Sequence, residues 1–148
     1  PVAVEALGDA GNNLSTEIWW SPTHPFKSSL TGETTRALAD GYTASVKKQW
    51  TQPVGFVHAL FEVAVDTLKR ARDVNDRSSI RDALAAANLN TIVGPVSWTS
   101  GGPVKNVTKT PLTGGQWVKG QSRMFDLVIV NNQTAPHIPA GGELQPIA

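Results

Sequence analysis

The opening hydrophobic pattern predicts a strand followed by a helix. Residues 15–20 are rich in β-forming side chains and stop at Ser21-Pro22, which suits a strand leaving a sheet. Beyond the loop of residues 24–29, Thr31 is a good N-cap and apolar residues recur at every fourth position, which predicts a helix over about 31–49. This apolar stripe consists of Leu38, Tyr42, Val46 and Trp50.

The most regular pattern in the chain begins at Pro53, a residue well suited to open a helix. The apolar residues that follow share one face through i, i+3, i+4 spacing and are Val57, Leu60, Phe61, Ala64, Leu68 and Ala71. Polar residues on the opposite stripe are four apart, which is typical of a solvated, partly salt-bridged face; they are His58, Glu62, Asp66 and Arg70. A third helix is predicted over about 78–88, with Asp76 or Ser78 as its cap. Its inward residues are expected to be Ile80, Ala83, Leu84 and Ala87.

After Asn88 the pattern changes to short β-type runs between glycines and prolines. We predict strands at 91–98, 115–120 and 124–130, with a turn at Gly101-Gly102-Pro103. Residues 125–130 are nearly all apolar, as in a strand covered on both faces, and residues 131–148 are expected to form an irregular tail or a strap across a partner surface. Because the strands are few and no opening βαβ unit is present, the chain looks like part of an α/β protein.

Composition narrows the possible functions. The 148 residues are 40% hydrophobic, enough for one globular domain, and the net charge of +1 is far from the basic excess of a nucleic-acid-binding protein. The absence of cysteine excludes disulfides and thiolate metal sites. The sequence contains neither a membrane-spanning apolar run nor a signal peptide, and it begins at Pro1. We therefore expect a processed or truncated chain whose targeting signal lies in the missing part.

Motifs for catalysis or cofactor binding do not stand out. No G-x-S-x-G elbow is present, and His24, His58 and His137 lie in unrelated contexts. His58 and Glu62 have the spacing of two metal ligands on one helical face, but a surface pair explains them better. Neither a Walker A loop nor a G-x-G-x-x-G turn occurs. We expect no enzymatic activity, no metal and no cofactor.

Tryptophan is the most unusual feature of the composition, with five Trp against one Tyr. Trp19 and Trp20 are adjacent at a predicted strand end, before a loop that contains His24 and Phe26. Because neighbouring strand residues point to opposite faces, one Trp is expected in the core and the other at a surface or cleft. Two interpretations remain: ordinary packing, or a ring that forms a stacking wall for a ligand.

Three segments together resemble a known family. They are the strand Glu17 to Trp20 with the loop to Phe26, the helix start Pro53 to Glu62, and Ile92 to Trp98. Their order is similar to the C-terminal part of type I periplasmic binding proteins, the solute-binding components of ABC transporters, in the branched-chain amino acid (Leu/Ile/Val-binding) family. The tryptophans and the His-Pro-Phe loop look most like members that take aromatic or other carboxylated compounds.

The resemblance implies a fragment of a two-lobed α/β fold, with helices on a mainly parallel sheet and crossover strands between the lobes. Residues 1–30 would end the second lobe and cross over, residues 31–90 would supply helices of the first lobe, and residues 91–148 would form late crossover strands and the C-terminal tail. The resemblance places ligand-binding residues at the crossover and at the start of the long helix, namely Trp19, Trp20, His24, Phe26, Gly55, Phe56 and His58.

The resemblance also implies a function. The parent protein would be periplasmic, would bind a small organic acid of the aromatic or branched-chain amino acid type between its lobes, and would deliver it to an ABC permease. The missing N-terminal part would be a partner of this chain, and an exposed lobe face could drive dimerisation. Alternatives are a ligand-sensing receptor domain of the same fold and an inactive folding fragment. The identity of the ligand is not implied, because the family's anchoring residues of the first lobe lie outside this chain.

Overall fold

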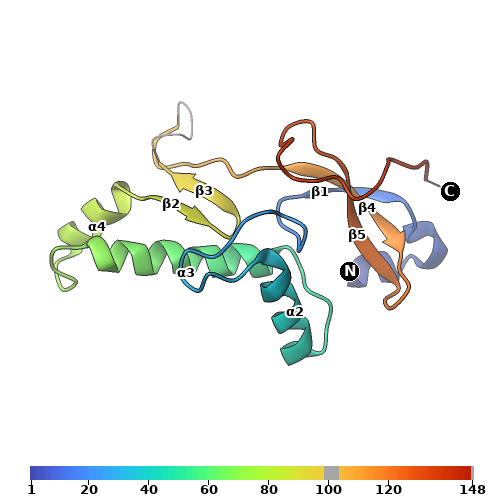
Figure 1. Ribbon diagram of the computed structural model, residues 1–148, viewed down its shortest axis with the longest axis horizontal. Helices are drawn as coiled ribbons and strands as arrows, with labels where there is room; N and C mark the ends of the chain where they lie inside the picture. Colours follow the sequence, from blue (N-terminus) through green and yellow to red (C-terminus); the bar gives the residue numbers. More distant parts are fainter. Residues whose placement is uncertain (99–103, 148) are drawn as a thin grey trace.

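The chain folds into a helical body and a sheet body that lie side by side (Figure 1). The computed structural model describes residues 1–98 and 104–147. The helices are α1 (Val2–Glu5), the 3-10 helix η1 (Gly8–Gly11), α2 (Thr35–Val46), α3 (Pro53–Arg70) and α4 (Arg77–Ala85). The strands are β1 (Leu14–Ile18), β2 (Asn88–Thr91), β3 (Gly94–Ser97), β4 (Thr113–Lys119) and β5 (Phe125–Asn131). Helices α2 to α4 and the β2–β3 hairpin form the helical body, and β1, β4 and β5 form the sheet body.

The sheet body has the strand order β1-β4-β5, and both of its pairings are antiparallel. The β2–β3 pairing is antiparallel as well, so every strand pairing in the described residues differs from the mainly parallel sheet that we expected. Short connections explain the antiparallel pairing of β2 with β3 and of β4 with β5. Only residues 120–124 join β4 to β5, whereas a parallel connection needs a crossover of a dozen or more residues.

The strand predicted at 91–98 is instead half of a hairpin. Thr91 ends β2 and pairs with Gly94, which begins β3 with a φ of +111°. Ile92 and Val93 form the turn, and both are buried, with 0% and 2% of their surfaces exposed. Their apolar character therefore reflects burial of a turn in the core and not a continuous strand. The turn predicted at Gly101-Gly102-Pro103 lies outside the described residues.

The helix starts predicted from the sequence are correct for α3 and α4 but not for α2. Pro53 opens α3, and Asp76 caps α4 by accepting hydrogen bonds from two backbone N–H groups of its first turn, as predicted. The cap of α2 is Thr34, which accepts from the N–H of Ala37, and not Thr31, whose hydroxyl donates to Glu33. Helix α2 is therefore shorter than predicted. The loop before it continues for three further residues, and the helix ends at Val46, where Lys47 adopts a left-handed conformation.

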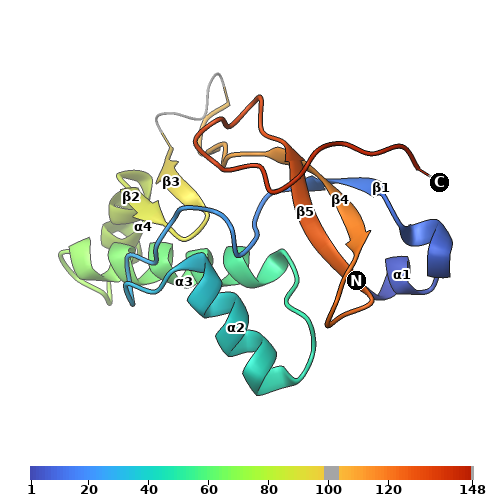
Figure 2. The ribbon, with the colours of Figure 1, turned by 45° about the vertical axis from the view of Figure 1, so that its right-hand side comes forward.

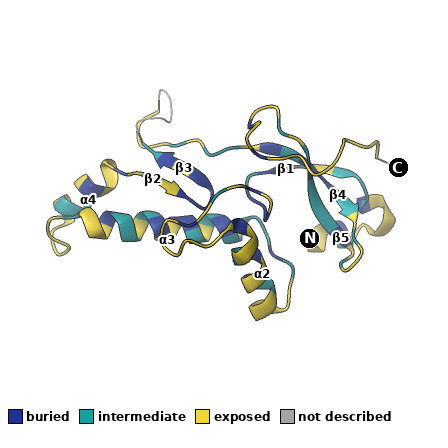
Figure 3. Cartoon of the chain, viewed as in Figure 1, coloured by how far each residue is buried: buried dark blue, intermediate teal, exposed yellow. Residues whose placement is uncertain are grey.

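The burial of α3 is the reverse of the sequence prediction (Figure 3). The predicted inward residues are exposed: 55% of Val57, 67% of Leu60, 60% of Phe61 and 47% of Leu68. The residues that α3 buries are Gly55, Ala59, Glu62 and Thr67. The face that we predicted to be solvated thus packs on the rest of the chain, although its Asp66–Arg70 ion pair forms as expected at 2.6 Å.

Glu62 explains how a polar stripe of α3 can be the buried one. It is 1% exposed, yet each of its two carboxylate oxygens accepts at least one hydrogen bond. One oxygen accepts from the backbone N–H and the hydroxyl of Ser29, and the other accepts from the N–H of Ile92 at 2.9 Å. Because hydrogen bonds compensate the loss of hydration, the carboxylate links α3 to the loop before α2 and to the hairpin turn.

Two apolar clusters form the core, one in each body. The cluster of the helical body contains Trp20, Ala39, Trp50, Ala59, Ile92 and Val93. The cluster of the sheet body contains Ile18, Ile129, Ala135 and Ile138. The tail crosses the sheet of its own chain, and the N–H of Gly141 donates to Ile129 O at 2.8 Å. Within β5 only Phe125 and Ile129 are buried, so the strand is less covered than its apolar run predicted. No helix of the described chain has the length and hydropathy needed to span a membrane.

Candidate ligand-binding site

The chain leaves the sheet body through a crossover, residues 19–26, that is fixed to the start of α3. Gln52 Oε1 accepts hydrogen bonds from the N–H of Trp19 at 2.8 Å and from that of Trp20 at 3.4 Å. Its Nε2 donates to Glu17 O at 3.0 Å. The amide therefore takes the place of a neighbouring strand just beyond the end of β1.

The two tryptophans point in different directions, as the alternation predicted. Trp20 is fully buried, and its ring meets Trp50 edge-on at 5.8 Å. The ring also lies directly over Gly55, where an added Cβ would be 2.4 Å from the nearest ring carbons. Trp19 is half-buried and meets Phe56 edge-on at 5.0 Å. Trp20 and Gly55 therefore act in core packing, and the Trp19–Phe56 pair keeps exposed surface that a ligand or another part of a longer protein can contact.

His24 is buried in the crossover loop, with 3% of its surface exposed. Its Nδ1 accepts from the N–H of Ser21 at 3.1 Å and lies 2.9 Å from the Ser21 hydroxyl. The neutral ring must then carry its proton on Nε2, which has no partner within the described residues. Burial, and secondly the charge of His137, lowers the pKa of His24 to about 4. The ring of Phe26 is 6.0 Å from that of His24 and 5.9 Å from that of His137.

His58 contacts a different part of the loop from the one that holds His24. Its Nε2 lies 2.7 Å from the hydroxyl of Ser28, in the loop before α2. The seven residues predicted from the resemblance are thus divided among an aromatic pair, a packed core contact, a buried histidine with its neighbouring phenylalanine, and a separate histidine. No cluster of three or more metal-ligating side chains occurs in residues 1–98 and 104–147.

A cleft of about 260 Å³ lies where the two bodies meet. Figure 2 shows that the connection between α2 and α3 faces the β4–β5 hairpin, and Gln49 Nε2 donates across this junction to Phe125 O at 3.1 Å. The cleft is lined by Ser21, Pro22, Thr23, Arg36, Trp50, Arg123, Asp126 and Leu127. Sequence reasoning identified the crossover but missed Arg36, Arg123 and Asp126, because no local spacing links the crossover to the start of α2 or to the β4–β5 hairpin.

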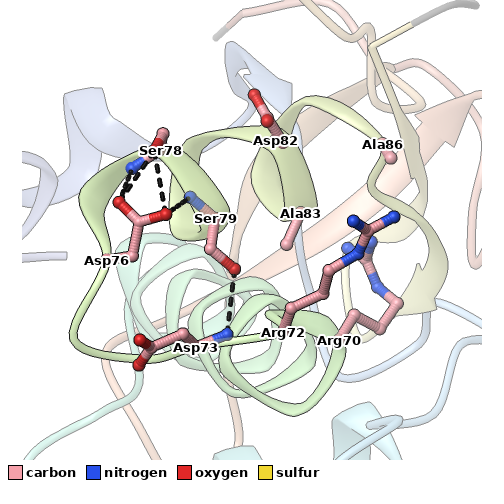
Figure 4. Close-up of a pocket in the computed structure, with 9 residues that line it drawn as sticks. All are labelled: Arg70, Arg72, Asp73, Asp76, Ser78, Ser79, Asp82, Ala83 and Ala86. Carbon is pink, nitrogen blue, oxygen red and sulfur yellow. Dashed lines mark hydrogen bonds between the residues drawn. The ribbon is translucent and has the colours of Figure 1, made fainter.

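A larger cavity of about 450 Å³ lies between the end of α3 and the start of α4 (Figure 4). Its polar groups are mostly engaged within the protein. Asp76 accepts from the N–H groups of Ser78 and Ser79, and the N–H of Asp73 donates to the hydroxyl of Ser79 at 3.0 Å. The first turn of α4 is therefore already capped, so the N–H groups of Ser78 and Ser79 are not free to bind a ligand.

The buried state of His24 predicts a pH dependence of stability. Its pKa falls from 6.5 to about 4 on folding, so the unfolded chain binds a proton over that range that the native protein does not. Stability is therefore complete above pH 6.5 and decreases as the pH falls toward 4, by a loss on the order of 3 kcal/mol. His24→Asn retains an acceptor for the Ser21 N–H and should remove this part of the slope. Urea unfolding of both proteins between pH 4 and 7 tests the prediction, which equal slopes would contradict.

Comparison with known proteins finds similarity to solved structures, and this similarity concerns the fold. No family model and no curated protein match the sequence. An ABC transporter substrate-binding protein from Sphaerobacter thermophilus is similar in structure with a TM-score of 0.62 and 11% identity, over 88% of this chain and 33% of that one. An ABC transporter solute-binding protein from R. palustris, solved in complex with benzoate, is similar with a TM-score of 0.61 and 16% identity, over 95% of this chain and 34% of that one.

The two similar structures confirm the α/β fold that the sequence resemblance implied. The chain spans about a third of the length of either of them. That share agrees with a fragment of a two-lobed fold. The chain therefore has the fold of about one third of a solute-binding protein of an ABC transporter.

Proposed function

We propose that the chain is part of the solute-binding component of an ABC transporter. In this proposal the complete protein works in the periplasm, binds a small organic acid of the aromatic or branched-chain amino acid type between two lobes, and delivers it to a permease. The main support is a cleft at the junction of two bodies, in a fold shared with two solute-binding proteins. One of these was solved with benzoate, an aromatic acid.

The division of the chain into two bodies fits a hinge. Strands β1, β4 and β5 share one sheet although about 95 residues separate β1 from β4, because the helical body is inserted between them. We assign residues 1–30 to the end of the second lobe and the crossover, 31–90 to helices of the first lobe, and 91–148 to the late crossover and tail. Rotation about the crossover would then open and close the cleft around a solute.

Binding suits the site better than catalysis. Ser21 and His24 form a close hydroxyl–imidazole pair at 2.9 Å, and Ser28 and His58 form another at 2.7 Å; a hydrolase could use such a pair. However, Ser28 is buried, with 4% of its surface exposed. Ser21 is 1% exposed, and the His24 Nε2 that a catalytic carboxylate would orient has no such partner in the described chain. A histidine with a pKa of about 4 is also a weak general base near neutral pH.

Helix α3 has an exposed apolar face, which another part of the longer protein would cover. This face, defined by Val57, Leu60, Phe61 and Leu68, is too apolar for a helix that solvent surrounds. We propose that the N-terminal part of the longer protein covers this face of α3. The two similar structures are about three times as long as the region that they share with this chain. In the isolated chain the same face would favour dimers.

A receptor domain of the same fold is the second candidate function. A signalling segment next to this region in the gene would favour it.

Thermal unfolding of the full-length protein with a panel of solutes tests the proposed function. The panel contains aromatic acids, branched-chain amino acids, amides and sugars. A solute at about 100 times its Kd should add about 2.7 kcal/mol of stability, which raises the Tm by a few degrees. Recovery of the solute unchanged after long incubation is expected for a binding protein. The proposal is wrong if no organic acid or amino acid raises the Tm, or if the bound solute is converted.

A further inference from the structure

The cleft at the junction of the two bodies presents two guanidinium groups that have little to bind within the chain. Arg36 lies in the first turn of α2, in the helical body, and its guanidinium makes no hydrogen bond or ion pair within residues 1–98 and 104–147. Arg123 lies in the β4–β5 connection, in the sheet body, where its Nη1 is 3.8 Å from Asp126 Oδ1. That contact is too long for a strong hydrogen bond, so most N–H donors of both side chains remain free.

We propose that Arg36 and Arg123 together bind the carboxylate of the solute, one from each side of the cleft; this inference rests on the function proposed above. A guanidinium presents its donors in a planar fork that matches the two oxygens of a carboxylate. Trp50 and Leu127 supply apolar lining in the same cleft. The arrangement therefore suits a small solute with one carboxylate and an apolar ring or branched chain.

The charge of the cleft selects among anions. Two arginines and one aspartate leave one net positive charge among its lining residues. A carboxylate neutralises that charge, whereas a dianionic phosphate would leave an excess negative charge beside Asp126. Since the two arginines belong to different bodies, a bound carboxylate would also bridge the bodies and favour the closed arrangement. A neutral amide of the same shape lacks the charge that both guanidinium groups require.

The test is calorimetric titration of the full-length protein with three probes: benzoate, its neutral analogue benzamide, and inorganic phosphate. If benzoate proves too weak, the aliphatic pair isovalerate and isovaleramide replaces the aromatic one. The variants are Arg36→Gln and Arg123→Gln, and the control is Arg77→Gln, an exposed arginine of α4 outside the cleft. We expect each cleft variant to weaken carboxylate binding about 10- to 100-fold, and the control to leave it unchanged. The amide should bind at least about 10-fold more weakly than the acid.

Several outcomes separate this inference from the proposed function. Equal binding of acid and amide, or undiminished carboxylate binding by both cleft variants, overturns the assignment of the two arginines but leaves a solute-binding protein. Tighter binding of phosphate than of either carboxylate overturns the choice of a carboxylate. If no solute of the wider panel binds, the proposed function fails and the arginine site fails with it. An unchanged Tm of the variants without ligand shows that lost binding is not lost folding.

Discussion

Replacing Leu60 and Phe61 together with alanine is expected to lower the free energy of unfolding of the full-length protein by at least about 4 kcal/mol. The two side chains are 67% and 60% exposed in this chain, where their loss should change stability little. If the N-terminal part of the protein covers them, the same substitution creates a cavity in a core. Alanine retains helix propensity, so α3 itself should not be weakened. Urea unfolding measured on both proteins gives the comparison.

The control for this comparison is Val74→Ala, which removes an apolar side chain that is 54% exposed in the loop after α3. Its effect should be within about 0.5 kcal/mol in both proteins. A second measurement follows the association of the 148-residue chain by sedimentation. Wild-type chain is expected to form dimers through α3, and the double variant is expected to be monomeric. A small loss of stability in the full-length protein would show that the face is not part of its core.

Replacing Gly55 with alanine is expected to lower the free energy of unfolding by about 3 kcal/mol or more. Helix propensity alone predicts the opposite, because alanine is favoured over glycine inside a helix by about 1 kcal/mol. However, the new Cβ would be 2.4 Å from the Trp20 ring, which is fully buried and also packed on Trp50. The ring cannot move away without disturbing that second contact. For a chain of this size the Tm should fall by about 10 °C.

Gly41→Ala is a matched control for Gly55→Ala. Gly41 also lies inside a helix, but an added Cβ there would meet nothing within 4 Å. We expect this variant to gain about 0.5 to 1 kcal/mol, as propensity predicts. Gly55→Ala should cost less in a Trp20→Leu background than in the wild type, because the smaller side chain leaves room for the methyl group. A Gly55→Ala protein as stable as the wild type would refute the close contact.

The local part of the fold was predictable from the sequence. Pro53 and Asp76 act as helix-start signals through properties of their own residues, a fixed φ and a side-chain acceptor, so distant contacts do not alter them. The strands near 115–120 and 124–130 were located correctly for a similar reason, since β-forming residues there are bounded by turn residues. The sequence did not distinguish Thr31 from Thr34 as the cap of α2, because any threonine hydroxyl can accept a hydrogen bond from the N–H three residues later.

The candidate site was only partly predictable. Adjacent strand residues alternate in direction, so the different environments of Trp19 and Trp20 followed from the sequence, although which ring is buried did not. Arg36 is far in the chain from Arg123 and Asp126, so these residues gave no signal of a common site, which forms only where the two bodies join. The ligand role of the residues taken from the family resemblance stays a prediction.

The sequence by itself determined that helices occupy most of α2, α3 and α4, where α3 and α4 begin, and approximately where β4 and β5 lie. These features depend on neighbours within a few residues. The resemblance to part of a solute-binding protein also came from the sequence, through the order of three segments. Only the tertiary structure decided which face of α3 is buried. Helix periodicity shows that two faces differ, but Glu62 lies inside because Ser29 and Ile92 supply its hydrogen bonds, and Leu60 lies outside because no described part of this chain covers it.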